Sequence, residues 1–267
     1  MDFGLKGKNI FLIGGHSNIG RDVSLAFAKE GAGITIGYGH DKARADKIAE
    51  QALSLGAAWA DTVQLDATEY GDVKRAVDQV LEHGDIDCIY LGIIWAKLAN
   101  FLEFDPAEWI IEYKVGLQSA MNVWHYAIPY MQKAHHGNFI NVASTMGRMH
   151  AVDEPVYGAM KAALIHLGQT IAMTVGKDGI RINFIAPGPT PPADFKDLPI
   201  NSGWHTFSYD DPKCQENIAA WNNYSPLGQF GNPMDNAYAA LYLASDLSGR
   251  HLTGQIIGTD GGTYMPK

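Results

Sequence analysis

The sequence predicts an α/β fold, in which a single Rossmann-type domain is built on a doubly wound parallel sheet. Short apolar runs of strand length alternate with longer segments of helical period, which is typical of a parallel sheet covered by helices on both faces. The 267 residues suit one large α/β domain. No repeat, low-complexity tract or linker interrupts the chain, so we expect one domain over residues 1–267.

Each predicted strand is a short apolar run bounded by turn-forming or polar residues. The first runs directly into two glycines, and the third ends at Asp66. The fourth is strongly apolar, as expected for a strand buried on both faces. In chain order the predicted strands are Asn9–Ile13, Ile34–Ile36, Trp59–Leu65, Ile86–Leu91, Asn138–Val142, Arg181–Ile185 and Gln255–Thr259.

The predicted helices place apolar residues on one face of a helical period. In the third, Val73, Val77 and Val80 share a face, and glycines from Gly31 onward stop the first. The fourth begins near Asp105 and could extend to Lys133. The predicted helices are Arg21–Glu30, Asp41–Leu55, Tyr70–His83, Asp105–Lys133, Pro155–Val175 and Pro233–Ala244.

Residues 189–232 interrupt the strand–helix alternation. The segment is rich in proline and in aromatic residues such as Trp204, Trp221 and Tyr224. Long insertions of this kind commonly form lids or binding segments. We therefore expect an irregular substrate lid, after which the last helix and strand complete the sheet.

A glycine turn joins the first strand to the first helix. Gly14 suits a tight turn and Gly20 suits close packing of the helix on the strand. The residues between them, including Ser17, Asn18 and Ile19, lie where backbone N–H groups and the positive end of a helix can bind the pyrophosphate of a dinucleotide. The alternative is a plain structural turn.

The ends of the next two strands bear on the adenosine half of a cofactor. Asp66 can bind the adenine amino group, cap the following helix, or do both. No acidic residue stands in Gly37–His40 to bind the ribose hydroxyls of NAD(H). His40, Lys42 and Arg44 could instead meet a 2′-phosphate, so we favour NADP(H) over NAD(H). A solvated basic helix start is the alternative.

Three side chains suggest a proton-transfer site. Tyr157 and Lys161 stand four residues apart, on one face of a predicted helix. The ammonium group of Lys161 is expected to favour the phenolate of Tyr157, which would then serve as general acid or base. Ser144 follows a strand, where its hydroxyl could steady a substrate oxygen. In isolation, each has an ordinary alternative: a helix surface pair, or a serine cap.

The conjunction of these motifs resembles the classical short-chain dehydrogenase/reductase family, in particular its bacterial β-ketoacyl-reductase-like members. Further matching motifs are Arg181–Gly188, Leu252–Gln255 and Asp260–Gly262, and the likeness spans nearly the whole chain. The resemblance implies a nicotinamide cofactor and a homotetramer or homodimer. It implies that Ser144, Tyr157 and Lys161 are catalytic. The cofactor-binding residues that it implies are Gly14, Ser17, Asn18, Ile19, Gly20, Tyr38, His40, Asp66, Ala67, Gly92, Tyr157, Lys161, Pro187, Gly188 and Thr190.

The chain departs from the family pattern around the cofactor. Ile13 replaces the first threonine, and Asn18 replaces the middle glycine of the turn. Because asparagine tolerates a left-handed backbone better than most residues, we expect the turn to survive. Leu91–Ile94 replaces an Asn-Asn-Ala-Gly motif. A threonine after the Pro-Gly pair is replaced by Pro192, and Thr190 is expected to hold the carboxamide instead.

The family asparagine that supports a proton-relay water falls on Gly116. Gln118 or Asn122 could compensate for it, or the relay could differ. These departures leave two alternatives to an oxidoreductase open, namely a non-redox enzyme on the same scaffold and a binding or regulatory protein.

The expected substrate pocket is apolar and rich in rings, which favours a hydrophobic or cyclic ketone and its secondary alcohol. Arg148 or His150 could meet a carboxylate or thioester tail. The alternative is that the aromatic residues only pack the lid. The pocket residues implied by family position are Ile94, Trp95, Met146, Met149, His150, Pro189, Trp204, Phe207 and Tyr209.

The composition narrows the range of partners. A formal net charge of −9 makes a nucleic-acid partner unexpected, because such proteins need a basic face. Cys88 and Cys214 have no arrangement typical of zinc or a disulfide framework, so we expect no metal. The N-terminus is not a signal peptide, and no run approaches the ~18 apolar residues of a membrane span. We therefore expect a cytoplasmic protein with a small-molecule carbonyl or alcohol substrate.

Overall fold

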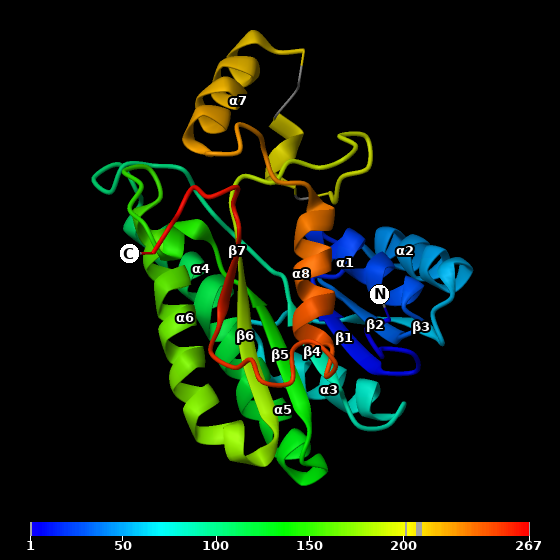
Figure 1. Ribbon diagram of the computed structural model, residues 1–267. Coiled ribbons are helices and arrows are strands. Elements are labelled where there is room, and N and C mark those ends of the chain that lie inside the picture. Colours follow the sequence, from blue (N-terminus) through cyan, green and yellow to red (C-terminus); the bar gives the residue numbers. More distant parts are fainter. Residues whose placement is uncertain (1, 201, 207–209, 267) are drawn as a thin grey trace.

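The computed structural model describes residues 2–200, 202–206 and 210–266. Within these residues, seven strands form one parallel sheet in the order β3-β2-β1-β4-β5-β6-β7 (Figure 1). The strands are β1 Asn9–Ile13, β2 Gly33–Tyr38, β3 Ala60–Gln64, β4 Cys88–Leu91, β5 Gly137–Val142, β6 Ile180–Pro187 and β7 Ile256–Thr259.

Helices cover both faces of the sheet. The α-helices are α1 Asn18–Lys29, α2 Lys42–Leu55, α3 Tyr70–Leu81, α4 Pro106–Tyr113, α5 Ser119–Ala134, α6 Pro155–Val175, α7 Pro212–Tyr224 and α8 Pro233–Ala244. Alternate residues of β1 point to opposite faces, as in any strand. Ile10 and Leu12 pack with α1, α2 and α8, whereas Phe11 and Ile13 pack with α3, α5 and α6. The predicted doubly wound α/β fold is therefore confirmed.

The strand order reverses between β1 and β4. The chain winds from β1 outward to β2 and β3, and then crosses back to β4 on the other side of β1. In open α/β sheets, ligands bind outside the carboxyl ends of the strands at such a switch point. Gly14 and Gly92, which follow β1 and β4, meet here: a Cβ atom on Gly14 would lie 2.8 Å from the carbonyl oxygen of Gly92.

The long helix predicted from Asp105 is interrupted. Residues Lys114–Gln118 form a π-helical turn between α4 and α5. Such turns are rare and frequently mark functional sites. Gly116 lies in this turn, and a Cβ atom there would be 3.0 Å from the Cβ atom of Met160, so glycine lets the turn approach α6 closely.

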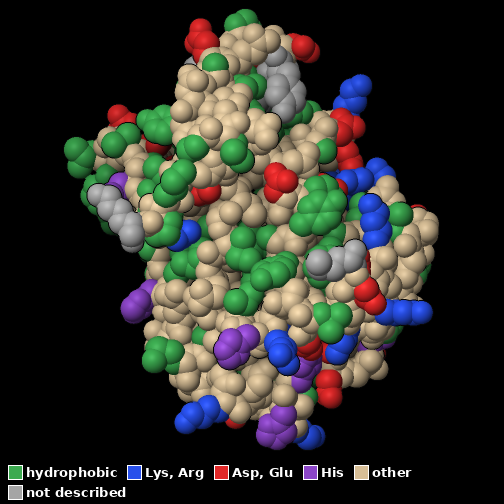
Figure 2. Space-filling view, viewed as in Figure 1, with side chains coloured by type: hydrophobic (Ala, Val, Ile, Leu, Met, Phe, Trp, Pro, Cys, Tyr) green, Lys and Arg blue, Asp and Glu red, His purple; other side chains and the backbone are tan. Residues whose placement is uncertain are grey.

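The segment 189–232, which we call the lid segment, lies beyond the carboxyl ends of the strands and projects from the body of the molecule (Figures 1 and 2). Its ends are joined by a hydrogen bond from Gly231 N to Pro189 O of 3.1 Å. The prediction of an irregular segment is wrong in one respect, because the segment contains α7 and a short 3₁₀ turn, Gly203–Thr206. Edge-to-face ring contacts hold it together and run from Phe195 to Trp204, Trp221 and Phe230.

Candidate active site

Ser144, Tyr157 and Lys161 come together at the carboxyl end of β5. Ser144 follows that strand and caps a 3₁₀ turn, accepting a hydrogen bond from Met146 N at 3.1 Å. Tyr157 and Lys161 lie on successive turns of α6, which begins at Pro155, a favoured first residue of a helix. Ser144 therefore serves as a cap, and its catalytic role stays a prediction.

Tyr157 is a buried phenol beside Ser144. Its side chain is 7% exposed and hydrogen-bonds to the Ser144 side chain. Burial raises the pKa of Tyr157 well above its usual value, the Ser144 hydrogen bond opposes this, and the negative charges of Glu154 and Glu112 add to it. Burial is the largest of these effects, and the role of Lys161 in favouring the phenolate stays a prediction.

Lys161 is held at the carboxyl end of β5. Its Nζ donates to the carbonyl oxygen of Val142 at 2.7 Å and lies 5.7 Å from the centroid of the Tyr157 ring. The side chain is 2% exposed, and burial lowers its pKa to about 8 against the opposing charge of Glu112. A lysine that is partly neutral near pH 8 can exchange a proton as well as supply positive charge.

The glycine turn is shaped for a close ligand. Gly14 has φ +79°, a left-handed conformation that favours glycine, and a Cβ atom on Gly20 would lie 2.1 Å from Gly14 O. Ser17 caps α1, its hydroxyl accepting from Gly20 N at 3.1 Å. The first N–H groups of α1, at Asn18 and Ile19, point out of this turn without intrahelical partners. These residues fit the pyrophosphate of a nicotinamide dinucleotide.

Asn18 preserves the turn by a different route from the one predicted. It is the first helical residue of α1, and among the described residues only His135 combines a side chain with a left-handed backbone. Its amide nitrogen donates to Thr190 O at 2.9 Å and so ties the turn to the lid segment. Thr190 is itself buried, and its hydroxyl donates to Gly188 O at 2.9 Å.

The ribose end of the groove is formed by the start of α2. Asp41 caps this helix through Arg44 N at 3.1 Å and accepts from Ile200 N of the lid segment at 3.3 Å. Arg44 is buried and donates to His16 O at 2.7 Å and to Asp197 at 2.6 Å.

Two other predicted cofactor residues lie at this end: Tyr38 is buried and His40 is exposed. Asp197 also pairs with Arg21 at 3.2 Å and Lys47 at 3.5 Å, so one lid carboxylate sits among three cations.

The adenine end lies after β3. Asp66 is exposed and accepts hydrogen bonds from the backbone and hydroxyl of Thr68 at 2.9 and 2.8 Å. The N-cap of α3 is Glu69, so the alternative of Asp66 as helix cap is wrong. Ala67 is buried, and its carbonyl oxygen accepts from the Asn122 amide at 3.0 Å.

The nicotinamide end is formed by the residues after β4 and β6. A Cβ atom on Gly92 would lie 2.3 Å from the buried Tyr90 ring, so only glycine fits. Pro187 ends β6, and Gly188 N donates to Thr259 O at 3.4 Å, which extends the pairing with β7. A Cβ atom on Gly188 would lie 3.1 Å from Asp260 Cα. The turns after β4 and β6 thus depend on glycine for their close packing at the carboxyl edge of the sheet.

Two of the family departures lie in the core. Ile13 and Leu91 are buried in the cluster that faces α3, α5 and α6. The amide groups of Gln118 and Asn122 donate to the loop after β3, so neither replaces the missing asparagine beside Lys161.

The residue that sequence reasoning missed is Glu112. It is fully buried, in the last turn of α4, and its charge acts on both Lys161 and Tyr157. Nothing in the sequence marked it, because a glutamate on a helix is ordinarily exposed.

The residues expected to line the substrate pocket differ in their exposure and in their existing contacts. Ile94 and His150 are exposed, and Trp95, Met146 and Met149 are half-buried. The Arg148 guanidinium stacks over the Tyr264 ring at 4.2 Å, so it is already engaged. Pro189 is half-buried, and Trp204 takes part in the ring contacts of the lid segment. Phe207 and Tyr209 lie outside the described residues.

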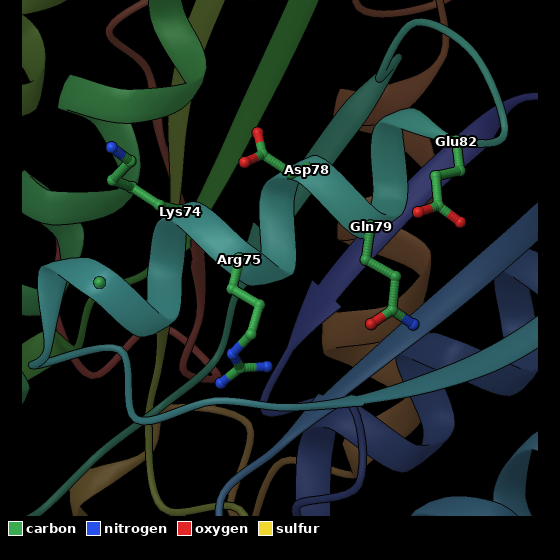
Figure 3. Close-up of a pocket in the computed structure, with 6 residues that line it drawn as sticks. Lys74, Arg75, Asp78, Gln79 and Glu82 are labelled. Atoms are coloured by element: carbon green, nitrogen blue, oxygen red, sulfur yellow. The ribbon is translucent and has the colours of Figure 1, made fainter.

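Two surface depressions lie away from this cluster. One, of about 760 Å³, follows the exposed side of α3 and is lined by mixed charges and Gln79 from that one stretch of chain (Figure 3). The other, of about 550 Å³, is apolar and lies between α4 and the first turns of α6, with Trp109 and Val156 in its walls. Neither includes Ser144, Tyr157 or Lys161. No helix in the described part of the chain has both the length and the apolar character needed to span a bilayer.

The chain is similar to known reductases over nearly all of its length. The family profile described as enoyl-(acyl carrier protein) reductase matches residues 14–264. The 3-oxoacyl-(acyl-carrier-protein) reductase FabG of Thermotoga maritima is 31% identical over 98% of this chain and 99% of its own. That of Chlamydia trachomatis is 32% identical over 97% of this chain and 98% of its own.

Solved structures share the fold. The L-sorbose reductase of Gluconobacter frateurii, complexed with NADPH and L-sorbose, superposes with a TM-score of 0.88 at 24% identity and 100% coverage of both chains. A short-chain dehydrogenase/reductase from Serratia marcescens superposes with a TM-score of 0.83 at 23% identity, covering 97% of this chain and 98% of its own. Together with the sequence matches, these findings identify the chain as a member of the short-chain dehydrogenase/reductase family, an NAD(P)-dependent oxidoreductase of the β-ketoacyl-reductase-like type.

Proposed function

We propose that this protein interconverts a ketone and a secondary alcohol, with Tyr157 as general acid or base. The observation that carries the proposal is the hydrogen-bonded pair of Tyr157 and Ser144, with Lys161 beside it, at the carboxyl edge that also holds the glycine turn. A bound nicotinamide supplies or accepts the hydride. The protonated, buried Tyr157 supports the reductive direction, in which a phenol gives its proton to the carbonyl oxygen.

Each of the three side chains has a distinct role in this proposal. Tyr157 donates the proton, and Ser144 holds the substrate oxygen within reach of the phenol. Lys161, fixed by Val142 O, stabilises the phenolate that forms when the proton leaves. The low exposure of Tyr157 and Lys161 keeps water from weakening these charge interactions.

We propose NADP(H) as the preferred cofactor. Asp41, the first acidic residue after β2, already caps α2 and contacts the lid segment, which leaves no carboxylate assigned to the ribose hydroxyls. Arg44, Arg21 and Lys47 gather around Asp197, and a 2′-phosphate could take the place of that carboxylate.

We propose a hydrophobic or cyclic ketone as substrate, closed in by the lid segment 189–232 within a single domain of residues 1–267. Met146 and Met149, which follow Ser144, and Trp95, which follows β4, are half-buried and support an apolar surface. The FabG relatives act on 3-oxoacyl groups by name, so ketones with a thioester tail belong in the same test.

The experiment is a fluorescence titration with NADPH and NADH, followed by absorbance of the reduced nicotinamide across cyclic, aliphatic and 3-oxoacyl thioester ketones. An enoyl thioester serves as the control substrate, because it offers a C=C bond in place of the ketone. Tyr157→Phe should lower kcat by about 10²- to 10⁴-fold and leave NADPH binding unchanged. Failure to bind either cofactor, or full turnover by Tyr157→Phe, would contradict the proposal.

We also propose that the protein is a homotetramer or homodimer. Large apolar side chains are exposed on α4 at Trp109 and Ile110, on α6 at Met173, and on α8 at Tyr238 and Tyr242. Exposed apolar side chains on helices of both faces of the sheet are compatible with subunit contacts there. Sedimentation equilibrium should give two or four chains per particle, and a concentration-independent monomer would rule the proposal out.

A further inference from the structure

Glu112 is buried in the protein interior, where a carboxyl group is energetically unfavourable. Its side chain is 0% exposed. Oε1 accepts one long hydrogen bond from Lys97 N at 3.3 Å, and Oε2 has no hydrogen-bond partner among the described residues. Burying a carboxyl group with so little compensation is unfavourable, so such groups are usually retained for a functional reason.

The π-helical turn and Gly116 bring Glu112 to the catalytic cluster. Glu112 directly precedes the last residue of α4, and the turn that follows packs on α6 at Met160, next to Lys161. The positive charge of Lys161 acts on Glu112, and Glu112 in turn acts on Lys161, Tyr157 and Glu154. No other carboxyl group among the described residues acts on both Tyr157 and Lys161 in this way.

Building on the proposed function, we propose that Glu112 is a proton-supplying residue that acts through Lys161 to restore the phenolic proton of Tyr157 after each turnover. Tyr157 and Lys161 are both too buried for free exchange with bulk water. Lys161 spends one N–H on Val142 O, which leaves two for other partners. Glu112 lies on α4, whereas Lys161 lies on α6.

The protons and electrons balance over one turnover. The carbonyl carbon gains a hydride as the reduced cofactor is oxidised, and the carbonyl oxygen gains the phenolic proton. The Tyr157 phenolate then takes a proton from the Lys161 ammonium. Glu112 passes its carboxyl proton to the Lys161 amine and regains one from solvent by way of Glu154, which is half-buried and interacts electrostatically with Glu112. Each reduction therefore consumes one solvent proton.

The groups around Glu112 make this exchange feasible near neutral pH. Burial raises the pKa of Glu112 to about 7, against the opposing charge of Lys161, whose own pKa is lowered to about 8. Glu154, partly exposed before α6, also has its pKa raised to about 7, by burial and by Asp153 and Glu112. Lys97, whose backbone contacts Glu112, has its ammonium group paired with Glu108. Closely matched pKa values allow protons to move in both directions.

The test compares the first turnover with steady turnover. In Glu112→Gln, which keeps the shape and removes the proton, ketone reduction in the first turnover should stay within about twofold of wild type, because Tyr157 starts protonated. Steady-state kcat should fall about tenfold to a hundredfold, with KM and NADPH binding unchanged. Small carboxylic acids in the buffer should restore part of the loss, and Glu112→Asp should retain part of the activity.

Glu103→Gln, an exposed carboxylate before α4, is the control and should match wild type. Equal kcat and an unchanged pH profile in Glu112→Gln would overturn the inference. So would an equal loss in the first and later turnovers, because that indicates a purely structural role.

A second measurement needs no turnover. Difference infrared spectra of the cofactor-free protein should contain a carboxyl band that titrates near neutral pH, is absent in Glu112→Gln, and moves to higher pH in Lys161→Met. A band that ignores Lys161→Met would overturn the inference even in an active enzyme. If wild type reduced no ketone while the band behaved as expected, only the proposed function would fall.

Discussion

At the scale of single residues, Gly20 shows how little room the glycine turn allows. A Cβ atom there would lie 2.1 Å from Gly14 O and 2.8 Å from the hydroxyl of Ser17. Gly20→Ala should therefore distort the turn, weaken NADPH binding at least about tenfold and lower the melting temperature. Gly71→Ala is the matched control, since nothing lies within 4 Å of the added atom. Titration and thermal unfolding measure both effects, and equal behaviour of the two variants would contradict the prediction.

Glu112 also makes a prediction about stability. Its pKa is raised from 4.5 to about 7, so the folded protein keeps a proton that the unfolded chain releases between those values. The resulting stabilisation is fully present below about pH 4.5 and is lost as pH rises through about 7.

The free energy of unfolding of wild type relative to Glu112→Gln should therefore decrease from pH 5 to 8, as measured by urea unfolding at each pH. The variant removes the carboxyl group of Glu112 together with its effect on the pKa of Glu154, so the difference reports on Glu112 and on that interaction. A constant or rising difference would mean that the pKa of Glu112 is not raised.

The sequence predicted which side chains meet better than it predicted their charge states. The spacing of Ser144, Tyr157 and Lys161 was sufficient to bring them to one site, because strand and helix periodicity determine their positions. The pKa of Tyr157 was not accessible in this way, since it depends on burial and on Glu154 and Glu112. A glutamate on a helix is ordinarily exposed, so Glu112 carried no sign of its burial.

At the scale of elements, the predicted strands and helices agree with the structure wherever hydrophobic periodicity was strong. α6 and α8 begin and end as predicted, whereas α1 begins three residues earlier because Ser17 caps it. The π-helical turn was missed because no proline marks residues Lys114–Gln118 within the predicted helix. α7 was missed because its polar residues show no clear apolar face and proline-rich sequence surrounds it.

The lid segment is tied to the cofactor end by one carboxylate, and this predicts an effect on cofactor choice. Asp197 neutralises Arg44, Arg21 and Lys47, so a 2′-phosphate must compete with it. Asp197→Asn should tighten NADPH binding about threefold, as expected for the loss of partly exposed ion pairs, and leave NADH binding unchanged. Asp194→Asn, in the same segment, is the control. Equal tightening for both cofactors would show that Asp197 acts on the lid segment alone.

At the scale of the whole molecule, the alternation of strands and helices predicted the sheet, because right-handed crossovers leave few arrangements of a parallel sheet. It also predicted that the cofactor and proton-transfer residues would share the carboxyl edge. The placement of the lid segment could not be predicted, since it depends on contacts between distant residues, such as Asn18 with Thr190 and Asp41 with Ile200.

Those distant contacts make the cofactor groove a junction between the two halves of the sheet and the lid segment. A ligand bound there stabilises only the folded chain, by about 2.7 kcal/mol at a hundred times its Kd. For a chain of 267 residues this corresponds to a rise in melting temperature of roughly 5–10 °C. NADPH should give this rise in wild type and Tyr157→Phe alike, and NADH should give less at equal concentration. A rise confined to active variants would mean that turnover, and not occupancy of the groove, produces the stabilisation.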